Sequence, residues 1–229
     1  GMSLRSFTLQ DLINRNAQLY GSNTALVFGA QRVTHAQYAR RTARLAAGLA
    51  AVGVGQGDRL AILAPNCLEY VDLLGAAARL GAIMVPINGR LSAEEVAYVI
   101  EDVAPRVLIV ADEYQTLLPQ RGLDNTLRYT LGVAPAPWQP VSALYRERDA
   151  PAAGLPSVTD GSGLLIIHTA AVGGRPRGAL LTHRGLITAS LQTQLAWHLT
   201  AADVNLGVLP LFHAVSYTHL RAHETREDL

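Results

Sequence analysis

A glycine-bearing segment in the last third of the chain holds the residue types best suited to chemistry. It reads His168, Thr169, Ala170, Ala171, Val172, Gly173, Gly174, Arg175, Pro176, Arg177 and Gly178. Loops of this kind can turn successive backbone N–H groups toward one anion, and glycine lets the backbone approach a phosphate because it has no Cβ. Arg177, with Arg175 nearby, can neutralise phosphate charge, since guanidinium suits bidentate contacts with phosphate oxygens. The segment therefore predicts a phosphate-binding loop.

The same segment also fits a plain connection between a strand and a helix. It matches neither the P-loop pattern nor the dinucleotide-binding fingerprint, whose glycines are spaced differently. An apolar strand at 164–167 precedes it, and a helix is predicted from about His183 to Leu199. A loop between a strand and a helix can wrap a phosphate, so the residues alone leave both interpretations open.

The elements around this loop alternate between helices and short apolar strands. Capping boxes predict helix starts at Thr34 and Ser92, Asn66 is expected to cap another helix, and Gly53 and Gly81 supply stops. The predicted strands are continuous apolar runs, at 60–64, 83–85, 107–110, 164–167 and 204–209. Such runs are typical of strands buried on both faces, so the sequence predicts an α/β fold whose parallel sheet has helices on both sides.

Between about Gly122 and Asp160 the periodic pattern weakens and prolines become frequent. We expect an irregular connection there that holds one strand near 127–131.

Composition narrows the class of protein. The 229 residues carry a formal net charge of +1 without a basic cluster, so a nucleic-acid partner is not expected. Cys67 is the only cysteine and is interpreted as a packed residue in the first turn of a helix, in a reducing compartment. There is no signal-peptide pattern, and the longest apolar stretch, at 45–54, is too short to span a bilayer. We expect a cytoplasmic protein without an integral membrane segment.

From Phe7 to about Ala214 the chain resembles the adenylate-forming superfamily, which includes AMP-forming acyl-CoA synthetases, luciferases and peptide-synthetase adenylation domains. The matching segments occur in family order, at 32–37, 53–62, 65–66, 81–88, 91–95 and 209–213. The resemblance implies an incomplete large amino-terminal domain of an acid–thiol ligase. Such an enzyme uses ATP and Mg²⁺ to activate a small carboxylic acid as an acyl-adenylate, and then transfers the acyl group to the thiol of coenzyme A.

The resemblance also identifies 169–178 as the cofactor-binding loop, with departures from the family pattern. Thr169, Gly174, Pro176 and Gly178 match it, and Arg177 stands for the usual lysine. The remaining positions replace one serine, one glycine and two threonines of the family, at Ala170, Ala171, Val172 and Gly173. Each lost hydrogen bond to a charged group is worth about 1.5–3 kcal/mol. We favour a subgroup with its own way of binding phosphate, because 174–178 is intact; a relative with weakened adenylation is the alternative.

Three histidines carry separate expectations. The resemblance places His213 by the acyl pocket, as a substrate-binding residue, while a partly buried structural histidine is an equal alternative. His168 stands where the family has an aromatic residue, so packing is favoured over catalysis. His183 is interpreted as a structural residue at the exit of the loop.

The last residues, 216–229, do not continue the family pattern and look like a translated sequencing adapter. His219 and His223 share a helical face with Glu224 beside them, but no third ligand is evident, so no metal site is predicted. We therefore expect a domain at 1–215 and a non-native tail after it. The resemblance implies that the family's ribose-binding aspartate, the acidic residue that helps hold magnesium and the lysine of the carboxy-terminal domain lie farther along. The fragment is therefore expected to be inactive by itself.

Two other functions compete with the ligase. One is a non-catalytic relative that binds nucleotide or acyl ligand through a degenerate loop. The other is a dinucleotide-dependent oxidoreductase, which the missing G-x-G-x-x-G argues against. The sequence does not reveal whether a fatty or an aromatic acid is used, nor the oligomeric state.

Overall fold

The computed structural model describes residues 6–147, 157–169 and 175–198, together with Thr200, Asp203 and Leu211. The helices within these ranges are α1 Leu9–Leu19, α2 His35–Ala51, α3 Leu68–Leu80, α4 Ala93–Val103 and α5 His183–Ala196, with the 3₁₀ helices η1 Asp112–Leu117 and η2 Val141–Leu144. The strands are β1 Thr24–Phe28, β2 Gln31–Thr34, β3 Arg59–Leu63, β4 Ile83–Pro86, β5 Val107–Val110, β6 Leu127–Thr130, β7 Gln139–Pro140, β8 Gly163–Thr169 and β9 Arg177–Thr182.

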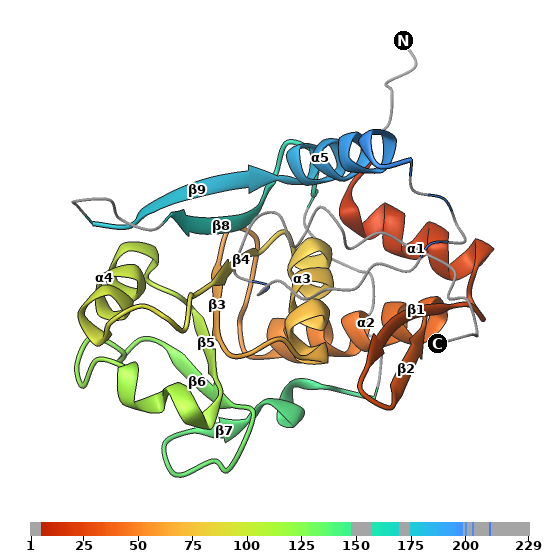
Figure 1. The fold of residues 1–229 in the computed structure, drawn as a ribbon. Coiled ribbons are helices and arrows are strands. Elements are labelled where there is room, and N and C mark those ends of the chain that lie inside the picture. Colours follow the sequence, from red (N-terminus) through yellow and green to blue (C-terminus); the bar gives the residue numbers. More distant parts are fainter. Residues whose placement is uncertain are drawn as a thin grey trace.

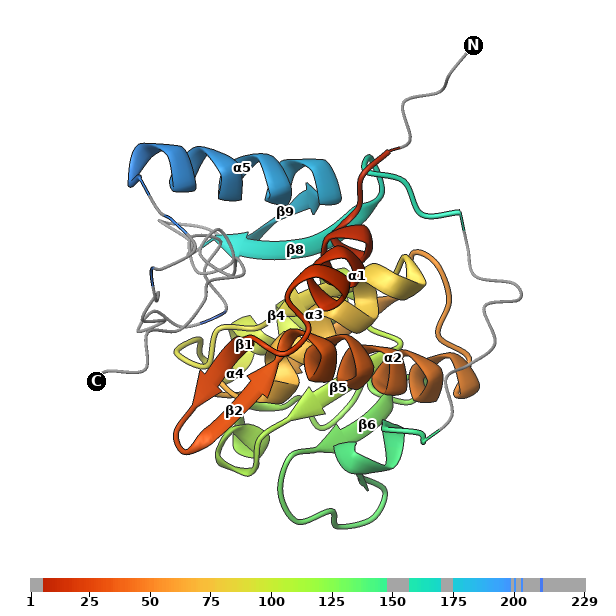
Figure 2. The same cartoon turned by 90° about the vertical axis from the view of Figure 1, so that its right-hand side faces the viewer.

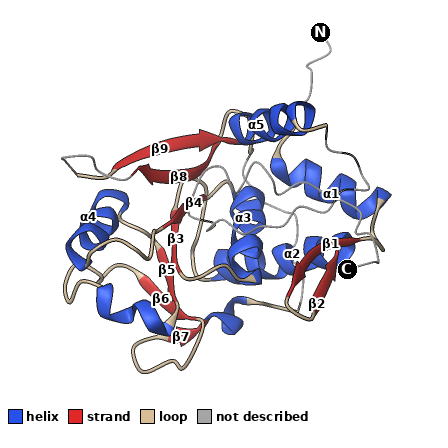
Figure 3. Ribbon diagram, in the orientation of Figure 1, coloured by secondary structure: helices blue, strands red, loops and turns tan. Residues whose placement is uncertain are grey.

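Within the described part, a seven-stranded sheet runs in the order β7-β6-β5-β3-β4-β8-β9, which Figure 3 shows as a column of strands. Every neighbouring pair from β7 to β8 is parallel, and only the pair of β8 and β9 is antiparallel. The α/β class and the parallel sheet predicted from the apolar strands are therefore confirmed.

Helices cover both faces of this sheet, with α2 and α3 on one side and α4 on the other (Figure 1). Alternate residues of a strand point to opposite faces. Accordingly, Leu60 and Ile62 of β3 belong to the core under α2 and α3, while Ala61 and Leu63 belong to the core under α4. Because both faces are covered, every residue of β5 is buried, which explains its uninterrupted apolar sequence.

The predicted helix ends are mostly confirmed. Thr34 and Ser92 each form a complete capping box, and Gly81 ends α3 in the left-handed region at φ +67°. The prediction for Asn66 was wrong. Cys67 is the N-cap of α3 and makes no side-chain capping bond. The Asn66 Oδ1 accepts a hydrogen bond from the backbone N of Leu211 instead, at 2.8 Å.

The sequence analysis predicts none of the first three elements, α1, β1 and β2. Helix α1 lies across α2 and α3, as Figure 2 shows, and the hairpin of β1 and β2 follows it. A usable signal existed, because Thr8 and Asp11 form a capping box at the start of α1.

The connection predicted to be irregular contains the expected strand, β6, and two unpredicted elements, β7 and η2. The segment after η2 is attached to the helices. Tyr145 donates a hydrogen bond from its hydroxyl to Oδ2 of the fully buried Asp72, at 2.7 Å. Arg41 binds the same carboxylate, with its Nη2 2.6 Å from Oδ2. A Cβ at Gly48 would overlap the backbone of Leu144, so this glycine permits the close approach.

The predicted order of strand, loop and helix around 168–178 was also wrong, because β9 intervenes. It pairs antiparallel with β8, from Thr169 opposite Arg177 to Gly163 opposite Thr182. Residues 177–180 of β9 are all exposed, so no position among them has to be apolar. The strand therefore lacks the alternation of apolar and polar residues by which a half-buried strand is recognised. The predicted phosphate loop, 169–178, thus includes the last residue of β8 and the first residues of β9, and α5 begins at the far end of β9.

No helix in the described ranges has both the length and the apolar content that a membrane span requires.

Candidate functional site

The predicted phosphate loop starts at the carboxyl edge of the parallel strands. Strand β8 runs parallel to β4 and ends at Thr169, where the loop begins. In open α/β sheets, ligands bind in the crevice outside the carboxyl ends of the strands. The structure describes Thr169 and residues 175–178 of the predicted site; Ala170, Ala171, Val172, Gly173, Gly174 and His213 lie outside the described residues.

The side chains after the loop differ in exposure. Pro176 is buried, whereas Arg175 and Arg177 are exposed. Thr169 and Arg177 face each other in the register of the hairpin, so the two ends of the loop lie side by side. Both guanidinium groups therefore belong to the same hairpin end as the predicted phosphate site.

Gly178 is needed here for packing inside the hairpin. It is the cross-strand neighbour of His168. A Cβ at position 178 would lie 2.9 Å from Cγ2 of Ile166 and 3.1 Å from Nε2 of His168, closer than ordinary contacts allow. The sequence alone assigns this glycine to the approach of a phosphate. The close neighbours show that a glycine is also required here by the packing of the hairpin.

His168 links the hairpin to α4. Its side chain is 5% exposed, and its Nε2 lies 3.2 Å from Oδ2 of Asp102 in the last turn of α4. Its Nδ1 has no hydrogen-bond partner among the described residues. A buried imidazole between a strand and a helix agrees with the packing role that the sequence favoured.

Arg175 contacts the same helix. Its Cζ lies 5.0 Å from the centre of the Tyr98 ring, within the range of a cation–π interaction. Tyr98 and Asp102 are one helical turn apart, so they share a face of α4. Sequence reasoning missed both residues, because nothing local marks a helix as the neighbour of a loop so far along the chain.

His183 is fully buried at the start of α5, and its Nδ1 accepts a hydrogen bond from the backbone N of Leu9 at 3.1 Å. Burial lowers the pKa of His183 to about 4, which keeps the imidazole neutral and able to accept that bond. The residue is structural, as expected, but it ties α5 to α1 at the opposite end of β9 from the loop.

Asn66 holds part of the family-like segment 209–213 at the same edge of the sheet. It follows the carboxyl end of β3, and its bond to Leu211 holds one residue of the segment 209–213 there. Leu211 is buried within the core beneath α2 and α3. The other residues of that segment, including His213, lie outside the described residues.

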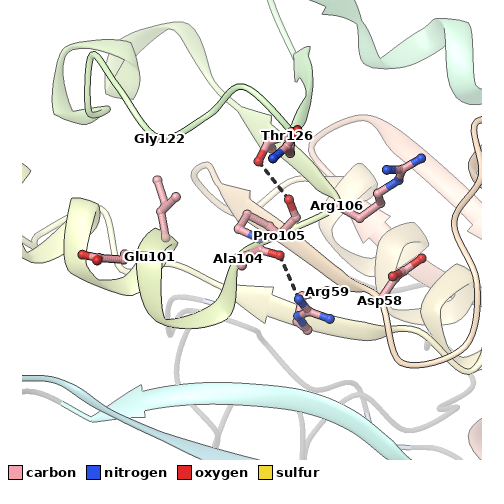
Figure 4. Close-up of a pocket in the computed structure, with 10 residues that line it drawn as sticks. Asp58, Arg59, Glu101, Ala104, Pro105, Arg106, Gly122 and Thr126 are labelled. Carbon is pink, nitrogen blue, oxygen red and sulfur yellow. Dashed lines mark hydrogen bonds between the residues drawn. The ribbon is translucent and has the colours of Figure 1, made fainter.

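A polar depression of about 330 Å³ lies at the opposite edge of the sheet, at the amino ends of β3, β5 and β6 (Figure 4). Arg59 donates from Nε to the carbonyl of Val103 at 2.6 Å and from Nη2 to that of Ala104 at 2.9 Å, satisfying the end of α4. Thr126 donates to the carbonyl of Pro105 at 2.9 Å. These side chains bind backbone carbonyl groups at and just after the end of α4. The depression itself lies at the edge of the sheet opposite to the one where the predicted loop begins.

Neither the cysteine nor the described acidic residues add a second reactive centre. Burial raises the pKa of Cys67 to about 12, so the thiol stays protonated at neutral pH, as its packed interpretation requires. Among the described residues, no group of three or more His, Cys, Asp or Glu could hold a metal ion. His219, His223 and the rest of 216–229 lie outside those residues.

Comparisons with known proteins agree with this architecture. The family model described as AMP-binding enzyme matches residues 13–222. A feruloyl-CoA synthase from Amycolatopsis is 34% identical over 202 residues, which is 88% of this chain and 39% of that protein. An indoleacetate–CoA ligase from Aromatoleum aromaticum is 32% identical over 207 residues, 90% of this chain and 41% of that protein.

A solved structure from Rhodopseudomonas palustris, described as a candidate long-chain-fatty-acid CoA ligase, superposes with a TM-score of 0.87 and is 41% identical. The match covers 97% of this chain and 57% of that one. This chain therefore spans about two-fifths of the length of the curated relatives, at 39% and 41%.

Proposed function

The chain belongs to the AMP-binding enzyme family, and from that membership we propose that it forms the phosphate-binding part of an ATP-dependent acid–CoA ligase. The observation that carries the proposal is the position of the loop 169–178. It begins at the carboxyl edge of a parallel sheet and ends in two exposed arginines on the same hairpin.

The proposed reaction has two steps. A carboxylate oxygen of the acid attacks the α-phosphorus of ATP, the bond from that phosphorus to the bridging oxygen breaks, and pyrophosphate leaves. The sulfur of coenzyme A then attacks the acyl carbon of the acyl-adenylate, AMP leaves, and the thiol proton is released. The names of two relatives, feruloyl-CoA synthase and indoleacetate–CoA ligase, support a reaction that joins an acid to coenzyme A.

In this reaction the loop would act by electrostatic positioning. Backbone N–H groups between Thr169 and Gly178, with Arg177, would hold the β- and γ-phosphates and stabilise the charge that develops on the leaving pyrophosphate. No covalent bond to the protein is required. We propose that Mg²⁺ arrives bound to ATP, as the counter-ion of its phosphates.

The acid is proposed to be an aromatic or fatty carboxylic acid. The relatives differ in the acid they use, with ferulate, indoleacetate and long-chain fatty acids among them. A panel of those three acids is therefore the first to test.

The decisive experiment is carboxylate-dependent exchange of pyrophosphate into ATP by a full-length protein that carries this segment. We expect exchange with at least one acid of the panel and loss of exchange with Arg177→Ala. The 229-residue chain alone is expected to show none, since the relatives are more than twice as long. ATP binding without exchange for any acid would support the non-catalytic alternative, in which the altered loop binds nucleotide but no longer activates an acid.

A further inference from the structure

One face of α4 contacts the chain at both ends of the predicted phosphate loop. Asp102 lies beside His168, just before the loop, and Tyr98 lies under Arg175, at the end of it. The opposite face of the helix is fully used by the core, through Val96, Val99, Ile100 and Val103. Tyr98 is only partly buried and is not part of that core, so its ring is available to the loop.

Stacking on an aromatic ring leaves an arginine able to bind phosphate. The face of the guanidinium meets the ring, while the five N–H donors lie in its plane and point outward from its edges. Within the described residues Arg175 makes no ion pair, and its Cζ lies over the Tyr98 ring, 5.0 Å from the ring centre. A cation held in this way loses little conformational entropy when an anion arrives.

We propose that Tyr98 is a positioning residue of the phosphate loop, which holds the Arg175 guanidinium so that its N–H edges can take triphosphate oxygens. This inference rests on the proposed function. It also gives a physical account of the altered loop. Ala170, Val172 and Gly173 stand where the family has hydroxyl donors, and a second, preorganised arginine supplies charged donors in their place.

The test is a double-mutant cycle in the full-length protein, with Tyr98→Leu, Arg175→Ala and the two combined. Calorimetry measures the dissociation constants of Mg-ATP and of inorganic pyrophosphate. We expect Tyr98→Leu to weaken both by about two- to fivefold, the range of an exposed cation–π contact, and to raise KM for ATP without changing kcat. In the Arg175→Ala background the same substitution is expected to change neither constant.

Two variants control for structure and charge. Tyr98→Phe keeps the ring face and should bind ATP like the wild type. Arg175→Lys keeps the charge without the planar fork and should weaken binding as much as Tyr98→Leu does. The Arg175→Lys result tests the proposal from the loop side even if Tyr98→Leu lowers the melting temperature.

The outcomes separate this inference from the proposed function. Unchanged ATP affinity in Tyr98→Leu, or an equal loss with and without Arg175, would show that Tyr98 does not act through the arginine and would overturn the inference while leaving the ligase intact. A wild-type protein with no affinity for ATP would overturn both.

Discussion

At the scale of single residues, Gly178 shows how one position can serve two purposes. Its place in a family-like loop suggests room for a phosphate. Its position opposite His168 shows that a side chain there would also collide within the protein, with Ile166 as well as with the imidazole. The contribution of Gly178 to the stability of the fold can be measured separately from its contribution to nucleotide binding.

We predict that Gly178→Ala destabilises the protein by about 1–3 kcal/mol, because an added methyl forces neighbours from their places. Gly161→Ala is the matched control, since a Cβ there would make only an ordinary 3.8 Å contact with Thr159. Denaturant unfolding of the two variants checks this difference. Equal midpoints would contradict the account of the hairpin, and His168→Ala in the Gly178→Ala background should restore part of the loss.

Asn66 is the opposite case, a residue whose local pattern was misleading. An asparagine before an apolar helix with Glu69 at the third position is typical of an N-cap. Its side chain instead binds the backbone of Leu211, 145 residues away. A local pattern does not reveal such a partner, because the competition between the two bonds is decided only when the chain is folded.

At the scale of elements, the connection between β6 and β8 depends on one buried carboxylate. Asp72 binds Arg41 from α2 and Tyr145 from the segment after η2, and the Arg41 guanidinium also lies 5.8 Å from the Tyr145 ring. A buried charge without its partners is costly, so these contacts fix the part of the connection around Tyr145 against the helices.

Tyr145→Phe is predicted to cost about 1.5–3 kcal/mol of unfolding free energy, the usual value for a hydrogen bond to a charged group. The ring remains to stack on Arg41, so the substitution isolates the hydroxyl. Amide hydrogen exchange in 141–147 should become faster. Tyr20→Phe, on an exposed tyrosine, serves as the control and should leave both measurements unchanged. No change in Tyr145→Phe would mean that the hydroxyl contributes nothing to this attachment.

At the scale of the whole molecule, one side of the described structure is open. Strand β9 is the edge of the seven-stranded sheet and leaves Leu180 58% exposed. On the neighbouring α5, Leu195 is 75% exposed, and Trp197, the C-cap residue after the helix, is 61% exposed. Strand edges at the side of a sheet and exposed apolar side chains favour association between molecules.

We therefore predict that the 229-residue chain expressed alone self-associates. Size-exclusion chromatography with light scattering should show species larger than the monomer, and Leu180→Lys with Leu195→Lys should shift the population toward it. Gln192→Lys, which adds a charge at an exposed polar position of α5, is the control and should have no such effect. A monodisperse wild-type chain that melts cooperatively would contradict the prediction.

What the sequence by itself determined is the set of local and strongly patterned features. Short-range hydrogen bonds define the capping boxes at Thr34 and Ser92 and the helix end at Gly81. Burial on both faces gives β3, β4, β5 and β8 their apolar runs. Residues close together in the sequence are therefore enough to predict these features. Most of the segments that resemble the family overlap these same helix ends and strands.

How those elements meet depends on contacts between distant parts of the chain. Strand β9 has no burial pattern of its own and exists because β8 offers it a partner. Tyr98 and Asp102 contact Arg175 and His168, at the two ends of the predicted phosphate loop, because the fold places β8 close to α4. Contacts of that kind depend on the packing of the whole chain, and for this reason no window of sequence contains them.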